Sequence, residues 1–230
     1  ADFIKSGIKT AEENGAACVI IELDTPGGLA ESMRLIVQNI LASKVPVVVF
    51  VYPGGARAAS AGVMITMAAD VAAMAPGTNI GAAHPVGAGG KEIDKTMSEK
   101  VINDMVAQAK SVAEKRGRNA KWVEDAIRES VSVTETEALK ENIIDLVAAD
   151  TDDLIKQLNG REIKDRGILK LDDVKKVTIK ETLRTKILKT ISNPNIAYIL
   201  MLVGIYGLIY EFSNPGAVVP GTVGAVSLLL

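Results

Sequence analysis

Three short runs of almost unbroken apolar residues stand out in the first eighty positions of the chain. They cover residues 17–23, 46–52 and 71–74, and Glu22 is the only charged residue inside them. A half-buried strand alternates apolar and polar side chains, whereas continuous apolar runs of this length are typical of strands covered on both faces. The pattern therefore predicts the central strands of a parallel sheet.

Between these runs, apolar residues recur at helical spacing. A first helix is expected to end at Asn14, and residues 29–41, 60–69 and 120–128 predict further helices. Ser98 is expected to cap a long helix after a glycine-rich loop at 87–95, and a capping-box pattern at Thr134 opens a short helix before a strand at 143–147. This alternation of strands and helices predicts an α/β fold with right-handed crossovers.

The C-terminal part of the chain has a different pattern. Residues 162–179 predict a small β appendage, residues 183–191 predict an amphipathic lead, and residues 196–210 are almost wholly apolar. A second apolar run starts at Thr222, so a membrane region is expected, with a buried pair of core helices as the alternative. The predicted domains are residues 1–160, the appendage and lead at 161–192, and a truncated transmembrane region at 193–230.

Composition narrows the classes of partner. The chain has 230 residues, a formal net charge of -2 and 3% aromatic residues, so neither a basic surface nor stacking platforms for nucleic acid are expected. The single cysteine, Cys18, lies in the first apolar run and is expected to be a buried thiol. We expect no metal ion and no cofactor.

Ser60 is the candidate nucleophile, because it lies where a turn after the second strand leads into a helix. The free N–H groups at the start of a helix can bind a developing negative charge. A second turn, with Gly27 and Gly28, follows the first strand and is expected at the same carboxyl edge of the sheet. The amide of Ala61 and one from Gly27 or Gly28 would then form an oxyanion hole. The alternative is that Ser60 only caps the helix.

Two residues compete for the role of general base. Lys100 is expected in the first turn of the long helix, and a bound apolar substrate would favour its neutral form by excluding water. His84 is the only histidine, and an imidazole changes its protonation near neutral pH without special surroundings. The alternatives are an exposed surface lysine and a loop histidine that only shapes the site.

Several motifs occur together in one order. They are Asp24-Thr25-Pro26-Gly27-Gly28, Ala59-Ser60-Ala61-Gly62, Asn79-Ile80-Gly81-Ala82-Ala83-His84-Pro85, Lys100-Val101-Ile102-Asn103 and Gly117-Arg118-Asn119. With them the chain resembles, over essentially its whole length, the NfeD family of membrane-bound serine proteases, whose protease domain is similar to Clp protease and signal peptide peptidase A. The resemblance implies a parallel-sheet domain of the Clp protease and crotonase type. It also implies a Ser-Lys dyad of Ser60 and Lys100, with the Gly-Gly turn in the oxyanion hole. Clp protease itself uses a Ser-His-Asp triad, which keeps His84 as an alternative base.

The resemblance also carries expectations about topology and partners. It implies a stomatin-like membrane protein as substrate or partner, assembly into a homo-oligomer, and a protease domain outside the cytoplasm. Family members normally begin with a signal peptide and a first strand ahead of the opening helix, so we expect this sheet to lack that strand.

The functional hypothesis is hydrolysis of hydrophobic peptide segments through an acyl-enzyme. Apolar residues near the predicted site, Leu29, Val63 and Met64, are expected to bind substrate, and the loop at 87–95 is expected to close over it. Two other hypotheses are a crotonase-type acyl-CoA enzyme, which shares this sheet topology, and a non-catalytic membrane scaffold. Crotonases usually carry carboxylates where this chain has Ser60 and Lys100.

Overall fold

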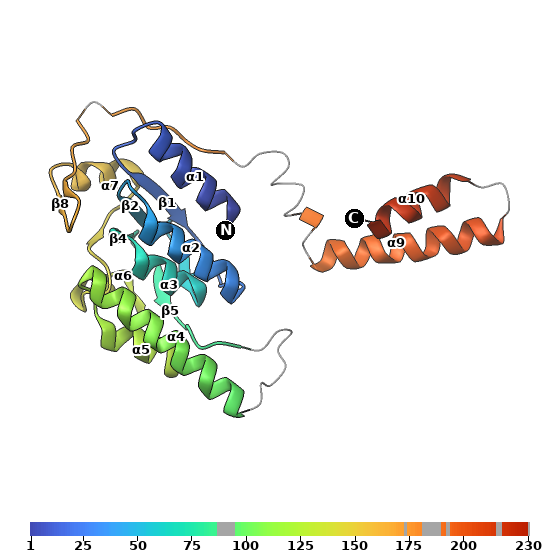
Figure 1. Ribbon diagram of the computed structural model, residues 1–230, viewed down its shortest axis with the longest axis horizontal. Coiled ribbons are helices and arrows are strands. Elements are labelled where there is room, and N and C mark those ends of the chain that lie inside the picture. Colours follow the sequence, from blue (N-terminus) through green and yellow to red (C-terminus); the bar gives the residue numbers. More distant parts are fainter. Residues whose placement is uncertain (87–94, 173, 181–189, 192–193, 215–217, 230) are drawn as a thin grey trace. The chain divides into compact units, whose positions relative to one another are not determined.

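The computed structural model describes residues 1–86, 95–172, 174–180, 190–191, 194–214 and 218–229 (Figure 1). The chain forms two compact units, Ala1–Lys176 and Val177–Leu230. The helices of the first unit are α1 (Asp2–Glu13), α2 (Ala30–Ala42), α3 (Ala61–Ala68), α4 (Lys95–Arg116), α5 (Ala120–Arg128), α6 (Glu135–Lys140) and α7 (Thr151–Leu158). Its strands are β1 (Val19–Leu23), β2 (Val47–Val51), β3 (Arg57–Ala59), β4 (Val71–Met74), β5 (Asn79–Gly81), β6 (Ser132–Thr134), β7 (Leu146–Val147), β8 (Glu162–Ile163) and β9 (Gly167–Ile168).

The central sheet has four parallel strands in the order β1-β2-β4-β7. All five residues of β2 are buried, as are all four of β4, because both strands are covered on both faces. The α/β fold class and the three strands predicted from apolar runs are confirmed.

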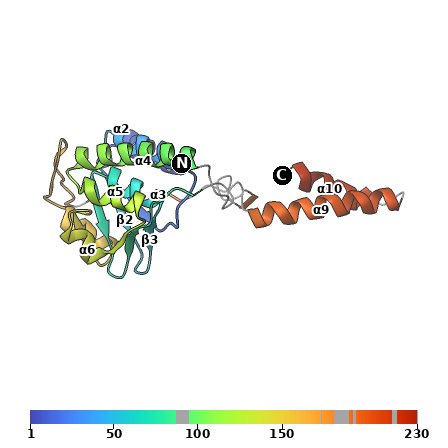
Figure 2. The ribbon, with the colours of Figure 1, turned by 90° about the horizontal axis from the view of Figure 1, so that it is seen from below.

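Alternate residues of β2 belong to two different hydrophobic clusters. Val47, Val49 and Val51 pack in the cluster that includes residues of α1 to α5, whereas Val48 and Phe50 pack with α7 and the β8–β9 hairpin. Helices α2, α4 and α5 accordingly lie together on one side of the sheet in Figure 2. The period of two along the strand assigns one layer of elements to each face.

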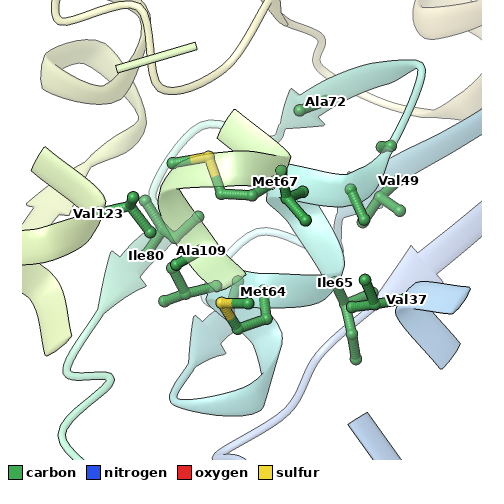
Figure 3. Packing of buried hydrophobic residues seen from close by; sticks show 14 of the residues in the cluster. Val37, Val49, Met64, Ile65, Met67, Ala72, Ile80, Ala109 and Val123 are labelled. Atoms are coloured by element: carbon green, nitrogen blue, oxygen red, sulfur yellow. The ribbon is translucent and has the colours of Figure 1, made fainter. Parts of the chain in front are cut away.

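Helix α3 is the centre of the larger cluster. All eight of its residues are buried. Figure 3 shows the α3 residues between Val37 and Val49 on one side and Ile80, Ala109 and Val123 on the other. A helix that is apolar all round has no solvent face, so α3 is held by packing in every direction.

A small mixed sheet with the order β3-β5-β6 was not predicted from the sequence. It brings β3, which leads into α3, beside β5. A Cβ added to Gly81 in β5 would lie 2.3 Å from the Val131 carbonyl oxygen and 2.4 Å from the Ser132 Cα, so only glycine fits this crossing.

A buried charge cluster ties elements together at the amino edge of the central sheet. The Asp70 carboxylate is fully buried and accepts hydrogen bonds from the Val47 N–H at 2.8 Å, from Arg116 Nη1 at 2.6 Å and from Arg166 Nε at 3.3 Å. Arg116 ends α4, and Val47 begins β2. The C-terminal end of α4 is therefore fixed at the edge where the strands begin.

The same cluster binds the last carbonyl groups of α3. Arg118 donates to the Met67 and Ala69 oxygens, each at 2.8 Å, and Arg116 Nε donates to the Ala68 oxygen at 2.8 Å. No following turn of the helix donates an N–H group to these carbonyl oxygens, so without the two guanidinium groups they would be buried and unpaired.

Two boundaries differ from the prediction. The strand expected at 143–147 is only β7, because the N–H groups of Ile143 and Ile144 both bond to the Ala138 oxygen and close the end of α6. Helix α4 begins at Lys95, three residues before the predicted cap at Ser98, which places Lys100 in the second turn. The capping box of Thr134 with Glu137 is confirmed.

The predicted appendage is a single hairpin, β8–β9. Ile163, Leu169 and Leu171 are buried in the smaller cluster, so the compact unit extends past the boundary predicted at residue 161. Residues 87–94 of the predicted loop and 183–189 of the predicted amphipathic lead lie outside the described residues.

In the second unit the structure describes the helices α9 (Pro194–Ser213) and α10 (Val218–Leu229). Residues Asn195–Ser213 form one apolar helix of 19 residues, long enough at about 1.5 Å per residue to cross a hydrocarbon core of about 30 Å. The two helices approach closely at glycines. A Cβ on Gly207 would lie 2.5 Å from the Pro220 oxygen, and one on Gly224 would lie 2.9 Å from the Gly204 oxygen.

Candidate active site

Ser60 occupies the single residue between β3 and α3. Its φ of 54° and ψ of -112° lie in a sparsely populated region, which costs a non-glycine residue about 1–3 kcal/mol. Its N–H donates to the Gly81 oxygen at 3.0 Å, and its carbonyl accepts from the Val63 N–H at 3.0 Å. The hydroxyl makes no side-chain cap bond, and it has no hydrogen-bond partner within the described part of the chain. Ser60 is thus held by its backbone while its side chain stays free.

Gly27 lies directly against Ser60. A Cβ on Gly27 would be 2.9 Å from the Ser60 Cβ and 3.2 Å from its Oγ, and the Gly27 φ is +130°. The two turns that were expected at one edge of the sheet therefore meet. The prediction that the two turns lie at one edge of the sheet is confirmed, although Gly27 and Ser60 are 33 positions apart in the sequence.

Two backbone N–H groups in these two turns have no hydrogen-bond acceptor among the described residues. Those of Gly28 and Ala61 donate to no acceptor in the ranges that the structure describes, because Gly28 lies in a turn and Ala61 is the first residue of α3. The N–H of Gly27, by contrast, donates to Thr25 Oγ1 at 3.1 Å. Of the two glycines named as alternatives from the sequence, Gly28 is the one with an available donor.

Lys100 is exposed on α4 and forms no ion pair or hydrogen bond with any described residue. Four residues further on, Asp104 pairs with Arg34 of α2 at 3.1 Å, so this face of α4 adjoins α2. Helix α2 starts at the carboxyl edge, just after the Gly28 turn, and α4 ends at the opposite edge. Lys100 therefore belongs to the part of α4 nearer the edge that holds Ser60.

His84 is half-buried, and its Nδ1 lies 3.0 Å from the Ile127 oxygen. Because a carbonyl oxygen only accepts, this contact assigns the proton to Nδ1 and leaves Nε2 as an acceptor. Within the described residues no hydrogen bond joins Ser60 to His84 or to Lys100. The structure thus brings Ser60 and the Gly27 turn together, whereas neither candidate base contacts Ser60.

The predicted substrate-binding residues divide into two groups. Leu29 is 77% exposed beside the Gly28 turn, and an apolar group there can contact a ligand. Val63 and Met64 are fully buried in the core, so of the three predicted substrate-binding residues only Leu29 is exposed. No group of three or more His, Cys, Asp or Glu side chains that could hold a metal ion occurs in the described portion of the chain.

One residue of this site was not singled out from the sequence. Thr25 bonds through its side chain to the Gly27 turn and through its backbone to β3. The available signal was its position two residues before a glycine, because threonine hydroxyls commonly bond the backbone two residues ahead.

Comparison with known protein families shows to which family the chain belongs. The N-terminal domain of NfeD1b matches residues 1–182, and the NfeD integral membrane domain matches residues 195–230. This chain belongs to the NfeD family. The resemblance based on its motifs is confirmed, and the second match identifies residues 195–230 as an integral membrane domain.

Two relatives of this NfeD chain are named proteins. The membrane-bound protease PH1510 of Pyrococcus horikoshii is 42% identical, over 97% of this chain and 52% of that protein. The membrane protein NfeD1b of Bacillus subtilis is 30% identical, over 100% of this chain and 52% of that protein. The chain spans about half the length of the curated relatives it matches.

Solved structures give the same result. The 1510-N membrane-bound stomatin-specific protease, as a lysine-to-alanine mutant in complex with a substrate peptide, superposes with a TM-score of 0.75 at 38% identity. This match covers 83% of the NfeD chain and 90% of that chain, and a serine-to-alanine mutant of 1510-N matches with a TM-score of 0.72. ClpP1 from Listeria monocytogenes shares the fold at 21% identity, with a TM-score of 0.52 over 66% of this chain and 85% of that chain.

Proposed function

We propose that this NfeD chain is a membrane-anchored serine endopeptidase that cleaves apolar peptide segments through an acyl-enzyme. The observation that carries the proposal is Ser60, whose strained backbone presents an unbonded hydroxyl beside Gly27, while the next residue after each, Ala61 and Gly28, has an N–H group without an acceptor among the described residues. The names of the relatives support it, because both PH1510 and 1510-N are called proteases.

In the proposed reaction, Ser60 Oγ attacks the scissile carbonyl carbon and gives its proton to the base. The N–H groups of Gly28 and Ala61 donate to the oxygen as negative charge develops on it, and a donor of this kind contributes about 10²–10³ in kcat. The C–N bond then breaks, and the base returns the proton to the leaving amine. Water, deprotonated by the same base, then attacks the Ser60 ester; the C–O bond breaks, the acid is released, and the base returns the proton to Ser60 Oγ.

Lys100 is the proposed base. It works only when its amine is neutral, and an apolar peptide lying across the carboxyl edge would exclude the water that favours the charged form. Two observations support this role: Lys100 has no ion-pair partner among the described residues, and its part of α4 lies toward that edge. The mutants solved for 1510-N, one at a serine and one at a lysine, fit the same assignment.

His84 is the competing base. Its orientation by the Ile127 carbonyl resembles the way in which a second group orients a catalytic imidazole, with Nε2 left to accept a proton. The carbonyl is neutral, however, and does not stabilise an imidazolium as a carboxylate does. This difference makes Lys100 the preferred proposal.

The proposed substrate is an apolar segment of a stomatin-like membrane protein, following the printed specificity of 1510-N. Exposed Leu29 next to the oxyanion turn supports a preference for apolar residues. The proposal further places the first unit outside the cytoplasm and includes assembly into a homo-oligomer. The crotonase and scaffold hypotheses have no comparable support from the named relatives.

The test is cleavage of an apolar reporter peptide by the full chain in detergent micelles. Ser60→Ala, Lys100→Ala and His84→Ala are compared with Lys115→Ala, which removes another exposed lysine of α4 near its opposite end. Loss of cleavage in Ser60→Ala and Lys100→Ala, with activity kept in the other two, is expected. Full activity of Lys100→Ala together with an inactive His84→Ala would assign the role of general base to His84. An active Ser60→Ala would exclude the serine mechanism.

A further inference from the structure

The side chain of Thr25 closes a small ring with Gly27. The Thr25 hydroxyl accepts the Gly27 N–H at 3.1 Å and donates to the Gly27 carbonyl oxygen at 2.9 Å. A threonine hydroxyl has one proton to donate and lone pairs to accept, so one group serves both polar atoms of the glycine. The peptide groups on both sides of Gly27 are thereby fixed.

The backbone of Thr25 is joined to the strand that leads into the nucleophile. Its N–H donates to the Arg57 oxygen at 2.8 Å, and its carbonyl accepts from the Ala59 N–H at 3.1 Å. These bonds pair Thr25 with Ala58 in a parallel bridge. One residue therefore connects the Gly27 turn to the residue directly before Ser60.

The methyl group of Thr25 makes a third contact, with the start of α3. A Cβ on Gly62 would lie 2.8 Å from Thr25 Cγ2, so the methyl group occupies the space above this glycine. Thr25 thus holds the turn, the strand before Ser60 and the helix after it. Its own side chain is half-buried beneath them.

We propose that Thr25 is a positioning residue for the oxyanion hole. Its hydroxyl occupies the N–H of Gly27, which selects Gly28 as the donor, and it fixes the distance between that donor and Ser60. Thr25 acts through Gly27 and touches no substrate atom. This inference rests on the proposed function, because it assigns the geometry of the same site.

Three variants of the full chain in micelles test the inference. Thr25→Val keeps the shape of the side chain and removes the hydroxyl, whereas Thr25→Ser keeps the hydroxyl and removes the methyl group. Thr78→Val is the matched control, because the Thr78 hydroxyl is buried and bonds the Ala75 oxygen at 2.6 Å. The readouts are kcat and KM for an apolar reporter peptide, and hydrogen exchange of the Gly27 amide after ¹⁵N-glycine labelling.

The expected result is a fall in kcat of about 10- to 100-fold in Thr25→Val with KM unchanged, since a misplaced donor weakens only the transition state. Exchange at Gly27 should become faster in the same variant, and Thr25→Ser should restore both. Thr78→Val should change neither. A wild-type kcat in Thr25→Val would overturn the inference, as would an equal loss in Thr25→Ser.

The amide measurement separates this inference from the proposed function. If the wild-type chain cleaves no peptide, the protease proposal fails, and the exchange of Gly27 still decides the role of Thr25. Faster exchange in Thr25→Val alone would support Thr25 as the residue that fixes the turn, and unchanged exchange would refute it.

Discussion

Replacing Gly27 by alanine should remove activity while leaving the fold in place. The added Cβ would lie 2.9 Å from the Ser60 Cβ, and real Cβ atoms essentially never come within 3.0 Å of another heavy atom. The contact is with the side chain of Ser60 itself, so relief requires the turn or the nucleophile to move. The φ of +130° adds backbone strain that no side-chain movement removes.

The magnitude has two parts. The strain of a non-glycine residue in this region lowers the free energy of unfolding by about 1–3 kcal/mol. A displacement of the reacting groups by about 1 Å costs about 10²-fold in rate, so kcat should fall about 100-fold in Gly27→Ala. The loss of activity should therefore exceed what the loss of stability explains.

The assay compares kcat with the midpoint of thermal unfolding in the same micelles. Gly15→Ala is the control, because Gly15 has a φ of +62° and nothing within 4 Å of an added Cβ. It should lose about 1 kcal/mol of stability from strain alone and keep its kcat. A Gly27→Ala variant that matches this control in both measurements would refute the contact between Gly27 and Ser60 as a determinant of catalysis.

Three further predictions concern charge and protonation. Asp70→Asn should lower the free energy of unfolding by about 3–5 kcal/mol in a urea titration, because burial lowers the pKa of Arg116 and Asp70 is the charge that opposes this shift. Hydrogen bonds from Lys110 and Arg128 lower the pKa of Glu124 from 4.5 to about 2, so the stabilisation that this carboxylate contributes is present above pH 4.5 and is lost as the pH falls toward 2. Glu124→Gln should therefore reduce the dependence of the thermal unfolding midpoint on pH between 4.5 and 2. The Cys18 thiol, expected from the sequence to be buried, is half-buried, and desolvation raises its pKa to about 11; an aromatic disulfide reagent at about pH 8 should therefore label it faster as denaturant unfolds the chain, and equally rapid labelling of the native chain would contradict the raised pKa.

The sequence was sufficient for the parts of the fold that have a strong periodic or compositional signal. The fully buried strands β2 and β4 were found because their apolar runs are unbroken. The three-residue strands β3, β5 and β6 were missed, since so short a segment shows no period and is formed by its partners. The meeting of Gly27 with Ser60 followed from the rule that parallel strands end at one edge.

The full burial of Val63 and Met64, which were predicted to bind substrate, has a cause that is visible in the sequence. Residues 61–68 are apolar on every side of the helix, and a helix of that kind is buried. The choice between Lys100 and His84 is different in kind. It depends on how α4 and α5 pack against α3, and neither periodicity nor spacing determines that packing.

The arginine contacts at the end of α3 have an electrostatic consequence for the other end of this helix. A short helix carries a partial negative charge at its C-terminus and a partial positive charge at its N-terminus. Arg116 and Arg118 donate hydrogen bonds to the negative pole, about 12 Å from Ser60 at about 1.5 Å per residue, and their own charges are paired with Asp70 and Asp145. These hydrogen bonds compensate the partial negative charge of the carbonyl oxygens, and in the proposed reaction the positive pole at Ala61 would attract the developing oxyanion.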